Sequence, residues 1–116
     1  MRIVLVLLAL LAAPVAAKAE FAQVTERERF VSLIEGRDLT RFGIRLEVTP
    51  GGQIEGRAFG RDVTGAWRWA QGYFCRDLYW GSMELGANCQ AVRQRGNTLR
   101  FISDQGNGRY ADLYLR

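Results

Sequence analysis

The sequence contains no histidine, and its single lysine is Lys18. Histidine is the side chain best suited to general acid–base catalysis at neutral pH and the most common metal ligand, so its absence argues against both roles. None of the serines lies in a G-x-S-x-G nucleophile motif, and no Walker motif or nucleotide-binding glycine turn is present. We therefore expect a protein that is not an enzyme and that needs no cofactor and no metal.

Cysteine is almost as scarce, with only Cys75 and Cys89 in the chain. Two cysteines without histidine are too few for a structural zinc site. An even pair in an oxidising compartment is typical of a disulfide, and two free buried thiols are the alternative. A Cys75–Cys89 bond would stabilise the fold by roughly 3 kcal/mol in the chain-entropy model for a loop of about 15 residues.

Long hydrophobic runs are also missing, except at the start of the chain. Ile3–Leu11 is unbroken and apolar, follows a positive start and precedes small residues, as in a secretory signal peptide. The run is too short to span a bilayer core of about 30 Å. We predict a signal peptide over residues 1–19, with cleavage after Ala17 or Ala19. A periplasmic or secreted single domain over residues 20–116 follows, and it is not membrane-spanning once processed.

The charge of the mature chain is small. The whole sequence has 16 basic and 12 acidic residues, and removal of Arg2 and Lys18 leaves 14 arginines, a net charge of +2. The arginines alternate with acidic residues, whereas nucleic-acid binding needs a clustered basic stripe, so no nucleic-acid partner is expected. The arginine excess agrees with codon bias, and recognition of anions by guanidinium groups is the alternative.

One helix is predicted over residues 26–35. Thr25 and Glu28 have capping-box spacing, and Gly36 follows at the usual C-terminal position. Four apolar residues recur at helical spacing and form one stripe: Phe30, Val31, Leu33 and Ile34. A helix of this length is not stable alone, so it must pack on an apolar surface, such as one end or one face of a sheet.

From Ile44 onward the apolar period becomes two, which is typical of strands. Turn residues divide the chain into seven predicted strands: Ile44–Thr49, Gln53–Gly60, Val63–Ala70, Tyr73–Trp80, Cys89–Gln94, Thr98–Ser103 and Arg109–Leu115. A longer polar loop is expected over Gly81–Asn88. The pattern predicts a mainly β protein: a small antiparallel meander that curls into a sheet or barrel, with one short N-terminal helix and one disulfide. Gly56 and Gly65, inside strands, suit points of tight coiling or close backbone approach.

Aromatic residues are concentrated between Trp67 and Trp80. Trp67 and Trp69 share a face with Val63, which favours a place in the core, although a binding surface is the alternative. Aromatic residues occupy both faces of the next strand, so one face cannot be wholly buried. Tryptophan, tyrosine and arginine at a rim are typical of binding surfaces. The candidate ligand- or partner-binding residues are Trp80, Tyr79, Arg76, Arg68 and Tyr73.

Thr64-Gly65-Ala66-Trp67, Gly72-Tyr73-Phe74-Cys75 and Asn88-Cys89 together form a T-G-x-W…G-x-x-C…C pattern. From about Ile34 to the C-terminus, the chain resembles a group of small secreted proteobacterial β-rich proteins of uncharacterised function. The resemblance implies a periplasmic β-rich domain and no active site. Some similar sequences carry the name dihydrodipicolinate reductase, but such a reductase needs a dinucleotide-binding βαβ unit that this pattern does not contain.

Three functions remain from the sequence. The leading hypothesis is a non-enzymatic periplasmic or envelope-associated domain that binds a protein or a small ligand. The second is a small inhibitor of a secreted or host hydrolase, similar in kind to lysozyme inhibitors, which would insert the loop Gly81–Asn88. The third is an enzyme, for which a carboxylate pair such as Asp62 and Asp77 suggests glycosidase chemistry.

Overall fold

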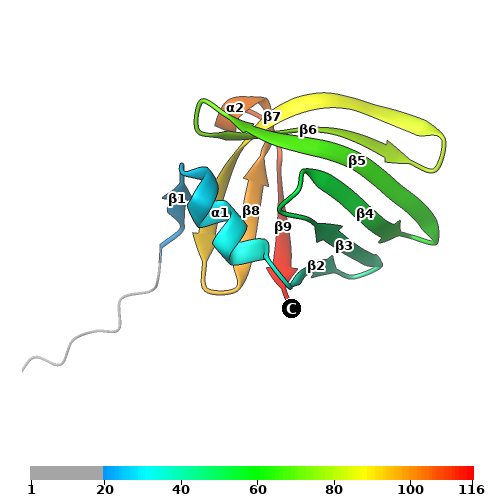
Figure 1. The fold of residues 1–116 in the computed structure, drawn as a ribbon, viewed down its shortest axis with the longest axis horizontal. Helices are drawn as coiled ribbons and strands as arrows, with labels where there is room; N and C mark the ends of the chain where they lie inside the picture. Colours follow the sequence, from blue (N-terminus) through cyan, green and yellow to red (C-terminus); the bar gives the residue numbers. More distant parts are fainter. Residues whose placement is uncertain (1–19) are drawn as a thin grey trace, which may run out of the picture.

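The computed structural model describes residues 20–116, so the predicted signal peptide lies outside the described residues. Within them the protein is mainly β, as predicted (Figure 1). The helices are α1 (Arg27–Ile34) and α2 (Ser103–Gly106), the latter a single turn. The strands are β1 (Ala22–Val24), β2 (Asp38–Arg41), β3 (Ile44–Val48), β4 (Gln53–Ala58), β5 (Arg61–Ala70), β6 (Tyr73–Trp80), β7 (Met83–Arg95), β8 (Thr98–Ile102) and β9 (Tyr110–Leu115).

The strands close into an antiparallel barrel. The pairing order is β7-β6-β5-β4-β3-β2-β9-β8, and β8 pairs back with β7, so β2 through β9 form a ring of eight strands. Strand β1 lies outside the ring and pairs with the second half of β7. Closure leaves the eight strands without free edges, which is one of the two solutions that the sequence predicts for so small a β domain.

All seven predicted strands are present, but the sequence analysis missed β1 and β2. Both are short, and β2 has a single buried apolar residue, Leu39, so neither shows a period of two. Their places come from tertiary pairing: β1 pairs with β7, and β2 pairs with β3 and β9. Pairing of this kind has no local sequence signal.

The predicted loop Gly81–Asn88 is wrong. Only Gly81 and Ser82 form the turn, and β7 runs from Met83 through this segment. Gly86, within this segment, lies at a β-bulge where the β6–β7 register shifts, with φ of 86°. A bulge commonly needs a glycine in this left-handed conformation, so the residue continues a bent strand instead of ending it.

Helix α1 agrees with its predicted bounds to within one residue at each end, but the predicted cap is wrong. Glu26 is the N-cap residue, and no side chain caps the helix. The Thr25 carbonyl instead accepts a hydrogen bond of 2.9 Å from the Trp69 indole. At the other end Gly36 has φ of 73°, as expected of a C-terminal glycine.

The core lies where α1 packs into one end of the barrel. Phe30 of α1 is completely buried, and its ring lies 5.1 to 5.3 Å from the rings of Trp67, Trp69 and Phe74. Trp67 is 6 % exposed, which confirms its predicted place in the core, and Trp69 packs against the same cluster while half-buried. The helix therefore plugs one end of the barrel with an aromatic cluster.

Gly56 and Gly65 occupy points of close backbone approach, as predicted. A Cβ atom on Gly56 would lie 2.1 Å from the Arg45 carbonyl oxygen, and one on Gly65 would lie 2.1 Å from the Asp77 carbonyl oxygen. Both contacts are with the backbone of the neighbouring strand, which cannot move aside cheaply. The two glycines therefore allow β3 to β6 to coil tightly enough for the barrel to close.

The predicted disulfide joins β6 to β7. Cys75 and Cys89 are directly opposite each other in the strand register and are bonded. The bond lies three residues from the bulge on each strand. Across residues 20–116, neither helix has the length and apolar character needed to cross a membrane.

Candidate functional site

The five predicted site residues do not form one surface. Strand β6 alternates, so Arg76 and Trp80 share the inner face with Phe74, which is buried in the core. Tyr73 and Tyr79 lie on the other face of β6. Arg68 shares that outer face, because it is opposite Cys75 in the neighbouring strand. The structure therefore divides the set between the inside and the outside of the barrel.

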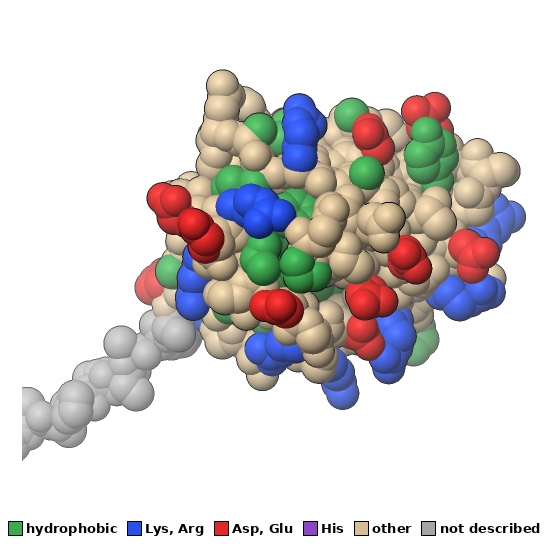
Figure 2. All heavy atoms as spheres, viewed as in Figure 1, with side chains coloured by type: hydrophobic (Ala, Val, Ile, Leu, Met, Phe, Trp, Pro, Cys, Tyr) green, Lys and Arg blue, Asp and Glu red, His purple; other side chains and the backbone are tan. Residues whose placement is uncertain are grey.

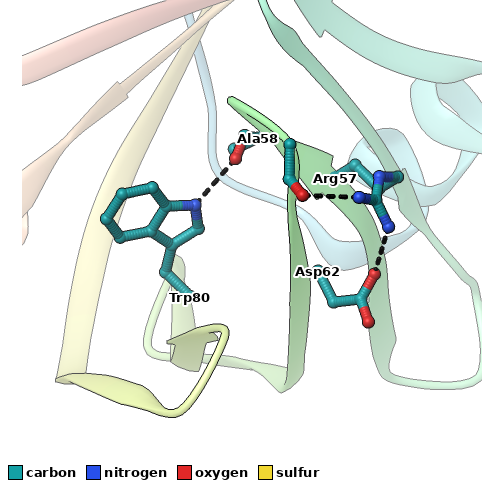
Figure 3. Close-up of polar contacts among 5 residues, drawn as sticks. Arg57, Ala58, Asp62 and Trp80 are labelled. Atoms are coloured by element: carbon teal, nitrogen blue, oxygen red, sulfur yellow. Dashed lines mark hydrogen bonds and ion pairs between the residues drawn. The ribbon is translucent and has the colours of Figure 1, made fainter.

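Trp80 is half-buried at the edge of the core and joins β6 to the β4–β5 hairpin. Its Nε1 atom donates a hydrogen bond of 2.7 Å to the Ala58 carbonyl, and Figure 3 shows the indole turned toward that group. The Arg61 guanidinium lies 4.7 Å from the centre of the indole ring. On the same hairpin, the Arg57 guanidinium donates a hydrogen bond of 2.7 Å to the Asp62 carboxylate. These contacts give Trp80 a structural role at the place where a binding role was predicted.

The inner face of β6 borders a cavity of about 180 Å³ within the barrel. Strands β2, β3, β4, β6, β7, β8 and β9 all contribute to its wall. Nine apolar side chains line it: Leu39, Leu46, Val48, Ile54, Phe74, Leu78, Phe101, Ala111 and Leu113. The remaining lining residues are Arg76 and Gln90, so a single charged side chain borders an otherwise apolar space.

The cavity is closed at one end and open at the other. Phe74 and Phe101 line it and also pack on Phe30, so α1 lies beneath its floor. Along the inner face of β9, exposure rises from buried Leu115 through half-buried Leu113 to exposed Ala111. The mouth is therefore at the start of β9, next to α2.

Arg76 is half-buried, and among the described residues the only hydrogen bond of its guanidinium is to a backbone carbonyl. Its Nη1 atom donates 2.7 Å to the Gly86 carbonyl at the bulge of β7. Within residues 20–116 no carboxylate forms an ion pair with it. Burial lowers the pKa of Arg76 from its usual value, and the charge of neighbouring Asp77 opposes this only in part. Arginine remains protonated at neutral pH, so the cavity wall carries a positive charge.

Gln90 is the second polar group of the wall and is only 9 % exposed. Its Nε2 atom donates 3.2 Å to the Ser103 hydroxyl of α2. Close by, Asn88 and Asp104 exchange two hydrogen bonds, of 2.9 and 2.8 Å. These bonds hold α2 against β7 beside the mouth, so the open end of the cavity has an ordered rim.

One residue of the cavity wall, Arg76, is among the binding residues predicted from the sequence. The row Phe74, Arg76, Leu78 and Trp80 is apolar except for Arg76, and a charge in such a row is a candidate functional position. The other lining residues look like ordinary core residues in the sequence. Nothing local distinguishes Leu46 or Leu113, which border a cavity, from Leu99, which is fully buried.

The two carboxylates that suggested glycosidase chemistry lie on neighbouring strands. Asp62 is bound to Arg57, and Asp77 is opposite Ala66, four residues along β5 from Asp62. At about 3.3 Å per residue, the backbone positions of the two are offset by about 13 Å along the strand direction. Over the described residues, no cluster of three or more acidic or cysteine side chains could hold a metal ion.

Charges of both signs are interspersed over the face of the molecule drawn in Figure 2. No single basic area dominates this face of the described chain. Comparison of the sequence with protein-family models, curated proteins and solved structures finds no match. The candidate site therefore depends on its own geometry: an apolar cavity with one guanidinium in its wall and one open end.

Proposed function

We propose that the protein is a non-enzymatic binding domain that holds a small molecule inside its barrel. The observation that carries this proposal is the cavity of about 180 Å³, apolar on most of its wall and bordered by Arg76 and Gln90. Ligand sites in proteins usually combine apolar walls with a few placed polar groups.

The size of the cavity limits the ligand. An apolar engineered cavity of about 150 Å³ binds benzene, whereas pockets for drug-sized molecules measure about 300–1,000 Å³. A cavity of about 180 Å³ therefore suits a ligand with the apolar volume of one aromatic ring or a short aliphatic chain. Larger ligands would have to extend through the mouth beside Ala111.

The proposed place of action is the periplasm or the extracellular space. The Cys75–Cys89 bond is consistent with an oxidising compartment, where such bonds persist. The signal peptide predicted over residues 1–19 supports the same compartment. A binding domain there would take up its ligand outside the cytoplasm.

Toluene, a neutral probe, tests the cavity by NMR. Addition to the ¹⁵N-labelled domain should shift the backbone amides of β6 and β9 that border the cavity. Ala111→Leu narrows the mouth and should weaken binding at least tenfold. Ala87→Leu adds the same bulk on the exposed outer face of β7 and is the matched control, which should bind as the wild type does. Shifts that are absent, or that survive equally in both variants, would contradict a cavity site.

A second candidate function is docking to a protein through two hairpin tips. Phe42 is 92 % exposed and Phe59 is 63 % exposed, at the β2–β3 and β4–β5 turns. The turns touch, because the Phe59 amide donates 2.8 Å to the Gly43 carbonyl. Phe59 has φ of 51°, which is costly for a bulky residue. Exposed aromatics on a braced tip resemble the insertion element of an inhibitor, at a different place from the loop that the sequence predicted.

Capture from periplasmic extract, with purified targets as follow-up, tests this candidate. The oxidised domain is compared with Phe42→Ser, which changes only an exposed tip. A hydrolase that is retained and inhibited by the wild type, but not by Phe42→Ser, would support docking. Equal retention by both proteins would contradict a role for the tip.

A further inference from the structure

Arg76 lies in a position that is unfavourable for a cation without a partner. It is half-buried in an apolar wall, and its only hydrogen bond within residues 20–116 is to the neutral Gly86 carbonyl. Removing a charge from water costs several kcal/mol, and an opposite charge repays that cost when its geometry is good and the remaining hydrogen bonds are satisfied. The other interior side chains of the cavity offer no negative group. An anion bound in the cavity would therefore supply the opposite charge that the Arg76 guanidinium lacks there.

The guanidinium retains donors for such an anion. Arginine has five N–H donors, and one of them is used by the Gly86 carbonyl. The planar group can present two parallel N–H bonds to a carboxylate, a geometry that gives both strength and orientation. The remaining donors of Arg76 are thus sufficient for a bidentate carboxylate contact.

The position of Arg76 is held by the backbone rather than by a flexible partner. The Gly86 carbonyl that accepts its hydrogen bond lies at the β7 bulge, and bulges often re-aim groups next to functional sites. The Cys75–Cys89 bond joins β6 to β7 at the residue that directly precedes Arg76. The guanidinium is therefore placed before any ligand arrives, which lowers the entropic cost of binding.

We propose that the ligand of the cavity is a small aromatic or short aliphatic carboxylate, with its anionic group on Arg76 and its apolar body against Phe74, Leu113 and their neighbours. This inference rests on the proposed function, because it assumes that the cavity is the binding site. The size of the cavity limits the apolar part of the ligand, and the single interior charge, on Arg76, favours an anionic group. Neutral molecules of the same shape satisfy only the first condition.

The test compares phenylacetate with phenylacetamide, which has the same ring but no charge. Each is titrated into the oxidised domain and followed by NMR shifts of the cavity residues. Phenylacetate should bind at least tenfold more tightly than the amide. In Arg76→Gln this preference should vanish, because phenylacetate weakens while phenylacetamide binds as before. Arg68→Gln removes an arginine from the outer face of the neighbouring strand and should keep the wild-type preference.

The outcomes separate the two proposals. Equal binding of acid and amide to the wild-type cavity would overturn the carboxylate inference and leave the binding function intact. Failure of both to shift the cavity residues at millimolar concentration would overturn both. A loss of preference in Arg68→Gln as large as in Arg76→Gln would mean that net charge, and not the interior guanidinium, attracts the anion. Melting curves of both variants verify that they are folded.

Discussion

At position 76 an arginine occupies an inner-face site of a strand whose neighbours on that face, Phe74 and Leu78, are apolar. If its role is to bind a ligand, the arginine should not stabilise the ligand-free fold. Arg76→Met removes the desolvated charge and fills a similar volume, and replacement of buried charges by apolar groups is often neutral or stabilising. We expect a melting temperature equal to or above that of the wild type, measured by circular dichroism. A fall of several degrees would indicate a structural arginine.

Gly65 is required for the stability of the fold, because the neighbouring backbone leaves no room for a side chain. Alanine at this position would place its Cβ atom 2.1 Å from the Asp77 carbonyl oxygen, and the resulting shift of backbone should cost about 1–3 kcal/mol. Gly51→Ala is the matched control, because its Cβ atom would meet only the Thr49 hydroxyl, at 3.9 Å. Chemical denaturation of both variants measures the difference. Equal stability of the two would contradict the account of tight coiling at β5.

The tryptophans should differ in their contribution to stability. Trp67 is 6 % exposed and packs on Phe30 and Phe74, so Trp67→Ala should cost about 3–5 kcal/mol. Trp80 is half-buried, so Trp80→Ala should cost less, although its bond to Ala58 makes the loss measurable. Thermal unfolding checks this, since 1 kcal/mol shifts a domain of this size by about 4–8 °C. Equal losses would place Trp80 in the core.

Single residues were predictable where burial alone decides their place. Trp67, the two strand glycines and the cysteine pair were all found from spacing and residue type. Among the predicted binding residues, Arg76 borders the cavity. The other four do not line it, because the place of each side chain depends on the closed barrel. Arg76 and Tyr79 are three residues apart on one strand, yet one borders the cavity and the other lies outside.

At the scale of elements, the β6–β7 pair depends on its disulfide. Reduction removes a cross-link between residues 14 positions apart, for which the chain-entropy model gives roughly 3 kcal/mol. We expect the melting temperature to fall by several degrees after verified reduction. The double variant Cys75→Ala/Cys89→Ala should melt at the lower temperature with or without reductant. An unchanged melting temperature would contradict the stabilising role of the bond.

Strands β8 and β9 should give the protein an acid-sensitive contact. Two hydrogen bonds from Arg100, of 2.8 and 3.0 Å, hold the pKa of Asp112 below its usual value. A lowered folded-state pKa means that this stability is present above the unfolded pKa of about 3.9 and is lost as the pH falls through the folded value.

Asp112→Asn removes the titrating group and serves as the comparison. The difference in melting temperature between wild type and variant should be constant from neutral pH to about pH 5 and should shrink below about pH 4. A difference that stays constant to the lowest pH would show that Asp112 does not gain stability from its ionised form.

Elements were predictable where a period and a stop signal coincide, as for α1 and the strands β3 to β6. The loop predicted over Gly81–Asn88 failed because a glycine can either end a strand or sustain a bulge, and only the pairing of β6 with β7 decides between the two. Strand β2 failed because four residues with one buried leucine carry no period. Both errors concern the strands that complete the ring.

For the whole molecule, the sequence indicated a curled β domain but not its order of pairing. Closure requires β9 to join β2, which pairs residues as far apart in the chain as Leu39 and Leu115, whereas β7 and β8 form a local hairpin. The cavity exists only as a result of closure, since seven strands contribute to its wall. Such a site forms only when the barrel is assembled. Its one indication in the local sequence is Arg76, a charged residue between apolar residues on the same face of β6.

The most direct test of the central claim is where a bound carboxylate lies. Intermolecular nuclear Overhauser effects between phenylacetate ring protons and protein methyl groups report this for the wild-type domain in solution. We expect contacts with Leu39, Leu113 and the Phe74 ring inside the barrel. Contacts only with the exposed tips at Phe42 and Phe59, or none at saturating concentration, would contradict an internal binding site.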